Sequence, residues 1–150
     1  MTDTAPPMTP RPIIGVGVVV LRAGPTGPEV LLIERGRPPR QGEWSIPGGC
    51  QEWGKAVQET AHRELMEETG VTVTGLRFVD VVDALWHTPE GTLERHMTLI
   101  DYRGLWSGGN ARAGDDASDV KWVPVSGLAR YNLWSETIRI IEAAVALGGV

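Results

Sequence analysis

The sequence has little of what would point to a secreted protein or to a nucleic-acid-binding protein. Cys50 is the only cysteine among 150 residues, so no intrachain disulfide can form, which suits a reducing cytoplasm. Basic residues are not in excess, because 14 Lys and Arg stand against 19 Asp and Glu and give a formal net charge of −5. Sequence-independent binding to nucleic acid needs a basic patch, so we expect no nucleic-acid partner.

No hydrophobic run is long enough to cross a membrane. Residues 13–21 (IIGVGVVVL) are apolar, but they are far fewer than the roughly 20 residues that span a bilayer. Residues 1–12 contain four prolines and no apolar run, so we expect no signal peptide and a disordered tail. We therefore expect no membrane partner and a cytoplasmic location. With 41% hydrophobic residues, residues 13–150 suffice for one core and are expected to form one domain.

Three carboxylates, on Glu64, Glu67 and Glu68, have the i, i+3 and i+4 spacing of neighbours on a helix. Like charges at this spacing destabilise a helix by about 0.2–0.5 kcal/mol per pair unless a cation lies between them. The three acids border the apolar stripe begun by Val57 and Ala61, whereas an ordinary solvated acidic face would lie opposite that stripe. Carboxylates suit Mg²⁺ or Mn²⁺, and Mg²⁺ is often shared with substrate phosphates. The spacing predicts a divalent metal site for phosphate chemistry.

Small and conformationally special residues flank this helix on both sides. Pro47, Gly48 and Gly49 let bare backbone approach a ligand or offer a carbonyl to a metal. Gly70 stands where a left-handed residue commonly ends a helix. The segment therefore reads as a loop, a helix and a second loop.

This segment resembles the Nudix box, G-x5-E-x7-R-E-U-x-E-E-x-G-U, in which U is an aliphatic residue. Eight of the nine defined positions agree in register, namely Gly49, Arg63, Glu64, Leu65, Glu67, Glu68, Gly70 and Val71. The ninth position, the first glutamate of the pattern, is occupied by Lys55. The resemblance implies an α/β fold, a Nudix-type α/β/α sandwich with a central mixed β-sheet.

The resemblance also implies a hydrolase of nucleoside diphosphates linked to another group. The metal ligands would be Glu64, Glu67, Glu68 and the carbonyl of Gly48, and Arg63 would orient the glutamates. A divalent ion held there would neutralise the diphosphate and activate water for attack on phosphorus. Catalysis of this kind consists mostly of positioning and charge stabilisation.

Lys55 raises a second hypothesis, a non-catalytic nucleotide-binding or regulatory domain. In the family, the glutamate at this position helps to brace the arginine. Here either Glu52 or Glu59 is a candidate to replace it, and Glu59 lies at i−4 from Arg63, a spacing that helices support. We expect retained hydrolysis, because Lys55 replaces a bracing residue and not an expected ligand.

The remaining elements follow from apolar runs, alternation and turn residues. We expect strands at residues 13–21, 29–34, 44–46, 76–84, 93–102 and 119–124, with a hairpin through residues 88–91. A short helical turn is expected near residues 125–129 and a C-terminal helix at residues 135–147. Strands interleaved with two good helices favour a layered α/β fold.

A catalytic base outside the box is sought in the polar segment of residues 107–118 (SGGNARAGDDAS). Long loops are often functional, and Asp116 lies six residues before Trp122, where some family members carry an additional carboxylate. Asp116 is therefore our candidate base, with Glu90 and Glu94 as alternatives. A merely solvated acidic loop is the competing interpretation.

Substrate contacts are predicted in the segment before the box. Arg35, Arg37 and Arg40 are candidates for binding phosphate, because a guanidinium can hold two oxygens at once. Trp44 is a candidate for stacking on a base, as are Trp86 and Trp106. The competing interpretations are a solvated basic loop and tryptophans of the core.

Within the family, our first choice of reaction is hydrolysis of ADP-ribose to AMP and ribose 5-phosphate. A nucleoside triphosphate pyrophosphohydrolase of the MutT type is the alternative. The expected partner is a small-molecule nucleotide, and the resemblance also allows a homodimer.

Overall fold

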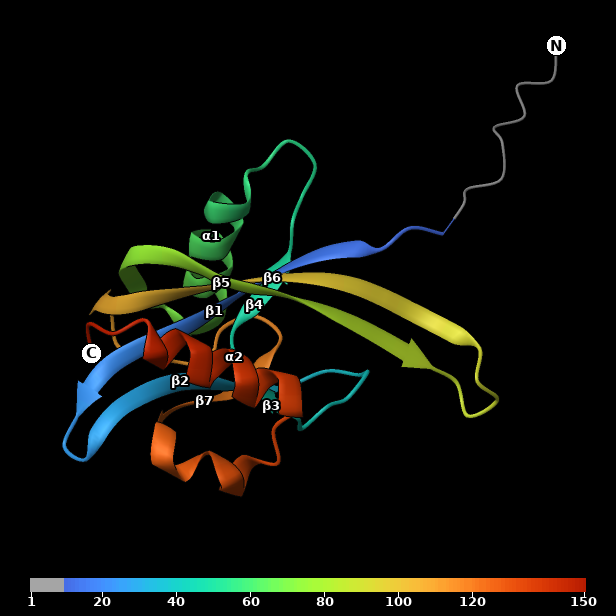
Figure 1. Cartoon of the computed structure of the whole chain (residues 1–150). Helices are drawn as coiled ribbons and strands as arrows, with labels where there is room; N and C mark the ends of the chain where they lie inside the picture. The colour runs from blue at the N-terminus through green and yellow to red at the C-terminus, as the bar shows by residue number, and fades with distance from the viewer. Residues whose placement is uncertain (1–9) are drawn as a thin grey trace, which may run out of the picture.

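A mixed sheet lies between two helical layers (Figure 1), in a computed structural model that describes residues 10–150. The strands are β1 (Ile13–Gly24), β2 (Gly27–Arg35), β3 (Trp44–Ser45), β4 (Gly48–Cys50), β5 (Thr72–His87), β6 (Leu93–Gly108) and β7 (Ala117–Pro124). The helices are α1 (Val57–Thr69), the 3₁₀ helix η1 (Val125–Tyr131) and α2 (Ser135–Ala146).

Strand β1 is the centre of the sheet. The main strand order is β3-β2-β1-β6-β5, with β4 also pairing with β1 and β7 pairing with β2. The β1–β6 pair is parallel and the other pairs are antiparallel. Residues 15–21 of β1 are all buried, as expected for a largely β-branched run with helices on both faces.

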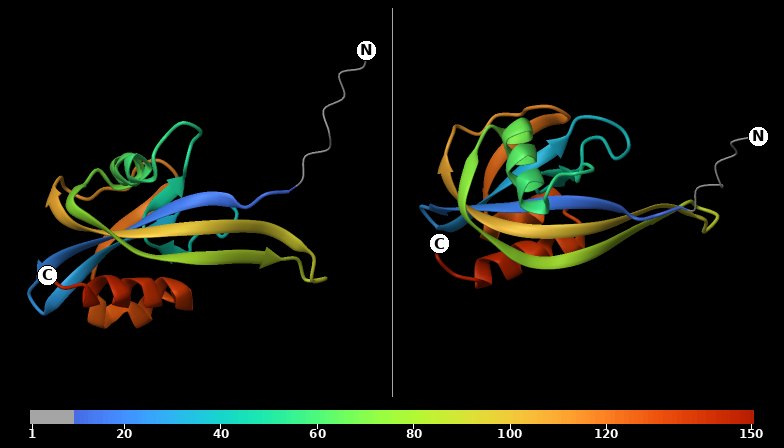
Figure 2. Two further views of the ribbon diagram at one scale, coloured as in Figure 1. Left: turned by 45° about the horizontal axis from the view of Figure 1, so that its top comes forward. Right: turned by 90° about the horizontal axis from the view of Figure 1, so that it is seen from above.

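The two faces of the sheet carry separate apolar clusters, and the alternation along β1 decides which residue joins which cluster. Val16, Val18 and Val20 pack with Leu65 of α1 on one face. Val19 and Leu21 belong to the cluster that contains the buried isoleucines of α2 on the other face. Figure 2 shows α1 on one side of the sheet and α2 with η1 on the opposite side.

The predicted fold class is confirmed, since a mixed sheet lies between helices. Helix α1 ends at Gly70, whose φ of 73° is left-handed, as the sequence indicated. Across residues 10–150, no helix has the length and apolar character required to cross a membrane. Of the predicted tail, residues 1–9 lie outside the described residues.

Three segments differ from the prediction. The expected glycine loop before the helix contains a short strand, β4, because Gly48–Cys50 pair with the free edge of Gly15–Gly17 in β1. Strands β5 and β6 are longer than expected and pair along most of their length. The polar segment at residues 107–118 is also a shorter loop than expected, since β6 extends to Gly108 and β7 begins at Ala117.

Candidate metal and substrate site

Helix α1 presents two of the box acids to β4. Its apolar face, with Ala61 and Leu65 buried, packs on the sheet and so fixes the rotation of the helix. The carboxylate of Glu64 lies against Gly49, where a Cβ would overlap it. Glu68, one turn further on, accepts a hydrogen bond of 2.7 Å from the backbone N–H of Gly48 to its Oε1. The glycine pair thus admits two carboxylates to the edge of the sheet.

Arg63 forms ion pairs with three acids of the loop and the helix. Its Nη1 lies 2.8 Å from Oε2 of Glu52, and its Nη2 lies 3.0 Å from Oε1 of Glu64. Its Nε lies 3.9 Å from Oε1 of Glu67, one helical turn away. The same Nη2 reaches the carbonyl of Cys50 at 3.5 Å, which ties the helix to β4. A guanidinium with several fixed partners constrains the orientation of Glu64.

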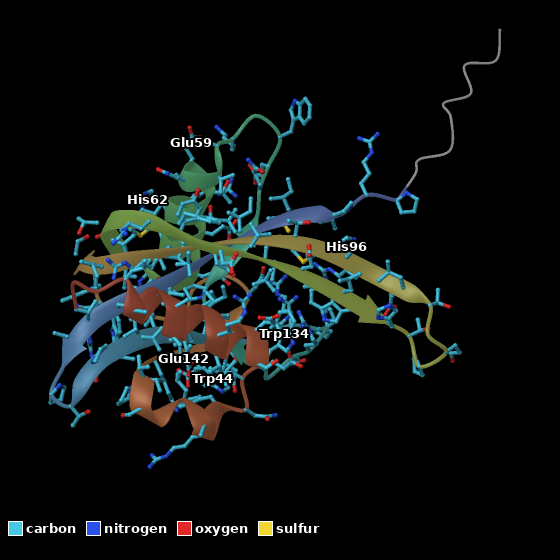
Figure 3. All side chains as sticks on the ribbon, in the orientation of Figure 1. Trp44, Glu59, His62, His96, Trp134 and Glu142 are labelled. Carbon is cyan, nitrogen blue, oxygen red and sulfur yellow. The ribbon has the colours of Figure 1, made fainter. Side chains whose placement is uncertain are left out.

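The bracing acid is Glu52 and not Glu59. Lys55 precedes α1 by two residues, and its backbone N–H donates to the carbonyl of Glu52 at 3.1 Å, which folds the loop toward Arg63. Within residues 10–150, Arg63 makes no ion pair with Glu59, which stands at the outer end of α1 (Figure 3). The loop therefore supplies from Glu52 the negative charge that Lys55 does not.

We expect Glu52→Gln to lower kcat by about tenfold, the lower end of the range for residues that orient metal ligands, because Glu52 is well exposed. The concentration of metal needed for half-maximal activity should rise, while KM for substrate stays unchanged. Glu59→Gln is the matched control, since Glu59 lies on the helix that carries Arg63, and it should change kcat by less than about twofold. Equal effects of the two substitutions on kcat and metal activation would contradict the bracing role of Glu52.

The electrostatic surroundings of the box acids favour a cation. Burial raises the pKa of Glu68 to about 7, with Glu64 and Asp116 adding to the rise and the Gly48 N–H opposing it. Burial also raises the pKa of Glu64, and Glu67 adds to that rise while Arg63 opposes it. A divalent ion beside such groups stabilises their charged form, and hard carboxylate and carbonyl oxygens suit Mg²⁺ or Mn²⁺. The residues therefore fit the predicted metal.

The box acids do not form a complete set of metal ligands in this arrangement. Within the described chain, no three His, Cys, Asp or Glu side chains converge in a metal-binding arrangement. The reason lies in their present partners, because Glu64 is bound by Arg63 and Glu68 by the Gly48 N–H. A metal bound there would need these carboxylates to exchange or share those partners.

A cavity of about 860 Å³ opens beside the acids. Glu68, Gly48 and Gly49 line it next to β1. Strands β1, β5 and β6 contribute further lining, as does the beginning of α2, where Trp134 lies (Figure 3). Its size falls in the range typical of small-molecule sites. Of the three box acids, Glu68 thus lies at the boundary between the acids and the cavity.

Three of the four predicted substrate residues line this cavity, namely Arg35, Arg40 and Trp44. Trp44 is half-buried, with its ring edge-to-face against Tyr131 at a centroid distance of 5.2 Å. Arg37 is not among the lining residues. Its side chain is 73% exposed, and its Nε lies 3.1 Å from Oδ1 of Asp116.

The candidate base Asp116 lies close enough to the acids to raise the pKa of Glu68, but it does not line the cavity. It is the last residue before β7, and its backbone carbonyl accepts a hydrogen bond of 2.8 Å from Gly36. Its ion pair with Arg37 means that proton transfer would require that contact to loosen. The alternatives Glu90 and Glu94 lie in or beside the β5–β6 hairpin and do not line the cavity.

The lining residues that were not predicted site residues include Arg95, Asp101, Asn132 and Trp134, together with Trp86, which the sequence suggested only as an alternative for stacking. Arg40 and Arg95 place their guanidinium carbons 4.5 and 5.5 Å from the centroid of the Trp86 ring. Burial lowers the pKa of Arg40, and the neighbouring Arg35 and Arg95 lower it further while Glu43 opposes them. The period-two alternation of β6 is the signal that groups Arg95 with Asp101 on one face.

The fold and the site define a class of α/β proteins in which a glutamate-rich helix and a glycine strand border a substrate cavity. A family model described as NUDIX domain matches residues 11–144. The chain therefore belongs to the NUDIX domain family, which confirms the predicted family.

Two curated relatives and one solved structure illustrate the similarity. An ADP-ribose pyrophosphatase of Methanocaldococcus jannaschii is 30% identical over 110 residues, which is 73% of this chain and 63% of that protein. A putative 8-oxo-dGTP diphosphatase 2 of Mycobacterium tuberculosis is 35% identical over 118 residues, 71% of this chain and 80% of that protein. The crystal structure of a MutT NUDIX hydrolase from Burkholderia pseudomallei has a TM-score of 0.74 at 27% identity and covers 89% of this chain and 98% of its own. The chain thus spans less than two thirds of the archaeal protein.

Proposed function

We propose that this chain catalyses divalent-metal-dependent hydrolysis of a diphosphate linkage in a nucleoside diphosphate derivative. The observation that carries the proposal is that Glu68 and Gly48 line the same cavity as Arg35, Arg40 and Trp44. The predicted metal ligands thus adjoin groups that suit a phosphorylated nucleoside. Membership of the NUDIX domain family supports the same reaction class.

Each residue of the site has a chemical task in this proposal. Glu64, Glu67, Glu68 and the carbonyl of Gly48 would hold Mg²⁺ or Mn²⁺, which when bound neutralises the diphosphate and activates water. Arg63 keeps Glu64 oriented through the contacts described above.

The substrate is positioned from the cavity side. Arg35 and Arg40 bind phosphate oxygens, and Trp44 offers an aromatic surface to the base. Asp116 accepts the proton released from the attacking water. Arg37, paired with Asp116 outside the cavity lining, is the remaining candidate contact to phosphate.

The substrate of first choice is ADP-ribose, cleaved to AMP and ribose 5-phosphate. The similarity to an ADP-ribose pyrophosphatase supports this choice, and the cavity has room for a ligand with two sugar rings. The second candidate is a nucleoside triphosphate pyrophosphohydrolase of the MutT type. It is favoured by the mycobacterial relative, of which this chain covers 80%.

A substrate panel separates these hypotheses. ADP-ribose, nucleoside triphosphates including 8-oxo-dGTP, dinucleoside polyphosphates and nucleotide sugars would be incubated with Mg²⁺ or Mn²⁺, and released nucleoside monophosphate would be measured. We expect turnover of at least one member that stops when the metal is chelated. Binding without turnover of any member would support the regulatory-domain hypothesis that Lys55 raises.

We propose a single domain over residues 13–150, a small-molecule nucleotide as partner, no nucleic-acid partner, and a cytoplasmic location. We include a homodimer because the family resemblance allows one. Light scattering of the purified chain would measure its oligomeric state.

A further inference from the structure

Asp101 is a buried carboxylate that the proposed reaction leaves without a task. It lies on β6, where its register partners are Gly17 of β1 and Asp80 of β5, and it lines the cavity. Only 5% of its surface is exposed. Its neighbours on the same face of β6 and β5 include Leu99 and Ala84. Asp101 therefore lies in a largely apolar part of the cavity wall.

The carboxylate of Asp101 has no hydrogen-bond donor or ion-pair partner within the described residues. Arg139 of α2 is the nearby cation, but its Nη1 bonds Asp80 at 2.9 Å and its Nε bonds Glu136. Burial raises the pKa of Asp101 to about 7, with Asp80 adding to the rise and Arg139 opposing it. A buried and unpaired carboxyl group destabilises the protein that contains it.

The surrounding backbone is arranged to admit this carboxylate. A Cβ on Gly17 would overlap Oδ1 of Asp101, so any other residue at position 17 would displace the side chain. Gly17 also pairs with Gly48 of β4, so that Gly48, Gly17 and Asp101 lie at one level on three adjacent strands. With strands spaced by about 4.8 Å, the Cα of Asp101 is about 10 Å from that of Gly48. A nucleotide whose diphosphate lies beside Gly48 is therefore long enough for its nucleoside to reach Asp101.

We propose that Asp101 is a specificity-determining residue that hydrogen-bonds a donor group of the nucleoside, either the ribose 2′-hydroxyl or an amino group of the base. The inference rests on the proposed function, because it takes the cavity as the nucleotide site. Bound substrate supplies the missing partner, and a nucleoside without the donor leaves the carboxyl unpaired. Such a site rejects the deficient analogue strongly, because an unpaired buried polar group opposes its binding.

Binding measurements with single-group analogues test the proposal. Titration calorimetry with Mg²⁺ would use ADP and GDP, their 2′-deoxy forms, and inosine diphosphate, which lacks the 2-amino group of GDP. The variants are Asp101→Asn, which keeps the side-chain volume, and Asp101→Ser as a smaller second substitution. Asp83→Asn is the control, because exposed Asp83 lies on β5 between the cavity-lining Val82 and Ala84 and points to the other face.

We expect Asp101→Asn to weaken the tighter of ADP and GDP by about tenfold, and Asp83→Asn to leave both unchanged. The loss should disappear for the 2′-deoxy form if a ribose hydroxyl is the donor. It should disappear for inosine diphosphate and persist for the 2′-deoxy form if the base amino group is the donor. The melting temperature of Asp101→Asn should not fall, whereas a purely structural Asp101 would lose stability on substitution.

The proposal is overturned if wild type and both Asp101 variants bind every probe within about twofold, or if all probes lose affinity equally. Absence of binding by wild type to every probe would overturn it together with the proposed function. Asp101-dependent binding without hydrolysis of any substrate in the panel would overturn the hydrolase proposal alone. Hydrolysis with unchanged specificity in Asp101→Asn would overturn the role of Asp101 alone.

Discussion

Glu68→Gln should reduce the rate of diphosphate hydrolysis by about 10³-fold, beyond the roughly 10–100-fold typical of residues that only orient a metal ligand. Glutamine has nearly the same volume, and its amide oxygen can still accept the Gly48 N–H, so the fold should be retained. What it lacks is the charge that would hold a divalent ion. The measurements are kcat on the best substrate of the panel, Mn²⁺ affinity by titration, and thermal unfolding.

Glu59→Gln is again the matched control, since Glu59 lies on the same helix but at its outer end (Figure 3). It should leave turnover and metal affinity unchanged. If Glu68→Gln retained full turnover and full metal affinity, Glu68 would not be a ligand and the proposed site would be wrong. If the melting temperature of Glu68→Gln fell so far that the variant was unfolded under the assay conditions, the loss of activity would point to a structural role instead.

The second large effect concerns stability and pH, and it depends on Asp101. Its pKa rises from an ordinary 3.8 to about 7 in the folded protein because of burial, which Arg139 opposes and Asp80 reinforces to a smaller extent. The folded state thus binds a proton that the unfolded state releases between these pH values, and stability falls as pH rises through that window. Ionisation of Asp101 therefore lowers the free energy of unfolding by about 4 kcal/mol above about pH 7. This destabilisation is absent below about pH 4.

Asp101→Asn removes this dependence. Burial of the unpaired neutral amide of asparagine lowers the free energy of unfolding by about 1–3 kcal/mol. The variant should therefore be more stable than wild type by about 1–3 kcal/mol at about pH 8. The advantage should shrink or reverse below about pH 3, where Asp101 is protonated in both states. Urea unfolding across this range measures the difference, and Glu68 does not confuse it because Glu68 titrates in both proteins. A pH-independent difference between the two proteins would show that Asp101 has an ordinary pKa.

The local sequence was sufficient for the box helix. Spacing of Glu64 and Glu68 by one turn depends only on helix geometry, and Gly70 ends the helix because a left-handed residue is needed there. The apolar stripe through Leu65 orients the helix on the sheet. The fold class followed from the same local patterns and from the family resemblance.

The brace of Arg63 shows the limit of local reasoning. Helix spacing made Glu59 an equal candidate, because i, i+4 pairs are common. The structure selects Glu52 at 2.8 Å, since the loop between β4 and α1 folds back on the helix. No spacing rule describes a loop contact of that kind, because it depends on the path of an irregular backbone.

The sequence by itself determined the box helix, the acids on it and the one central apolar strand, because helix and strand periodicity act over a few residues. Only the tertiary structure decided that Arg37 pairs with Asp116, that Glu52 braces Arg63, and that Asp101 faces a cavity opposite Gly17. These contacts join segments far apart in the chain. Their geometry is set by strand register and by helix packing on both faces of the sheet, and neither can be read from any single segment.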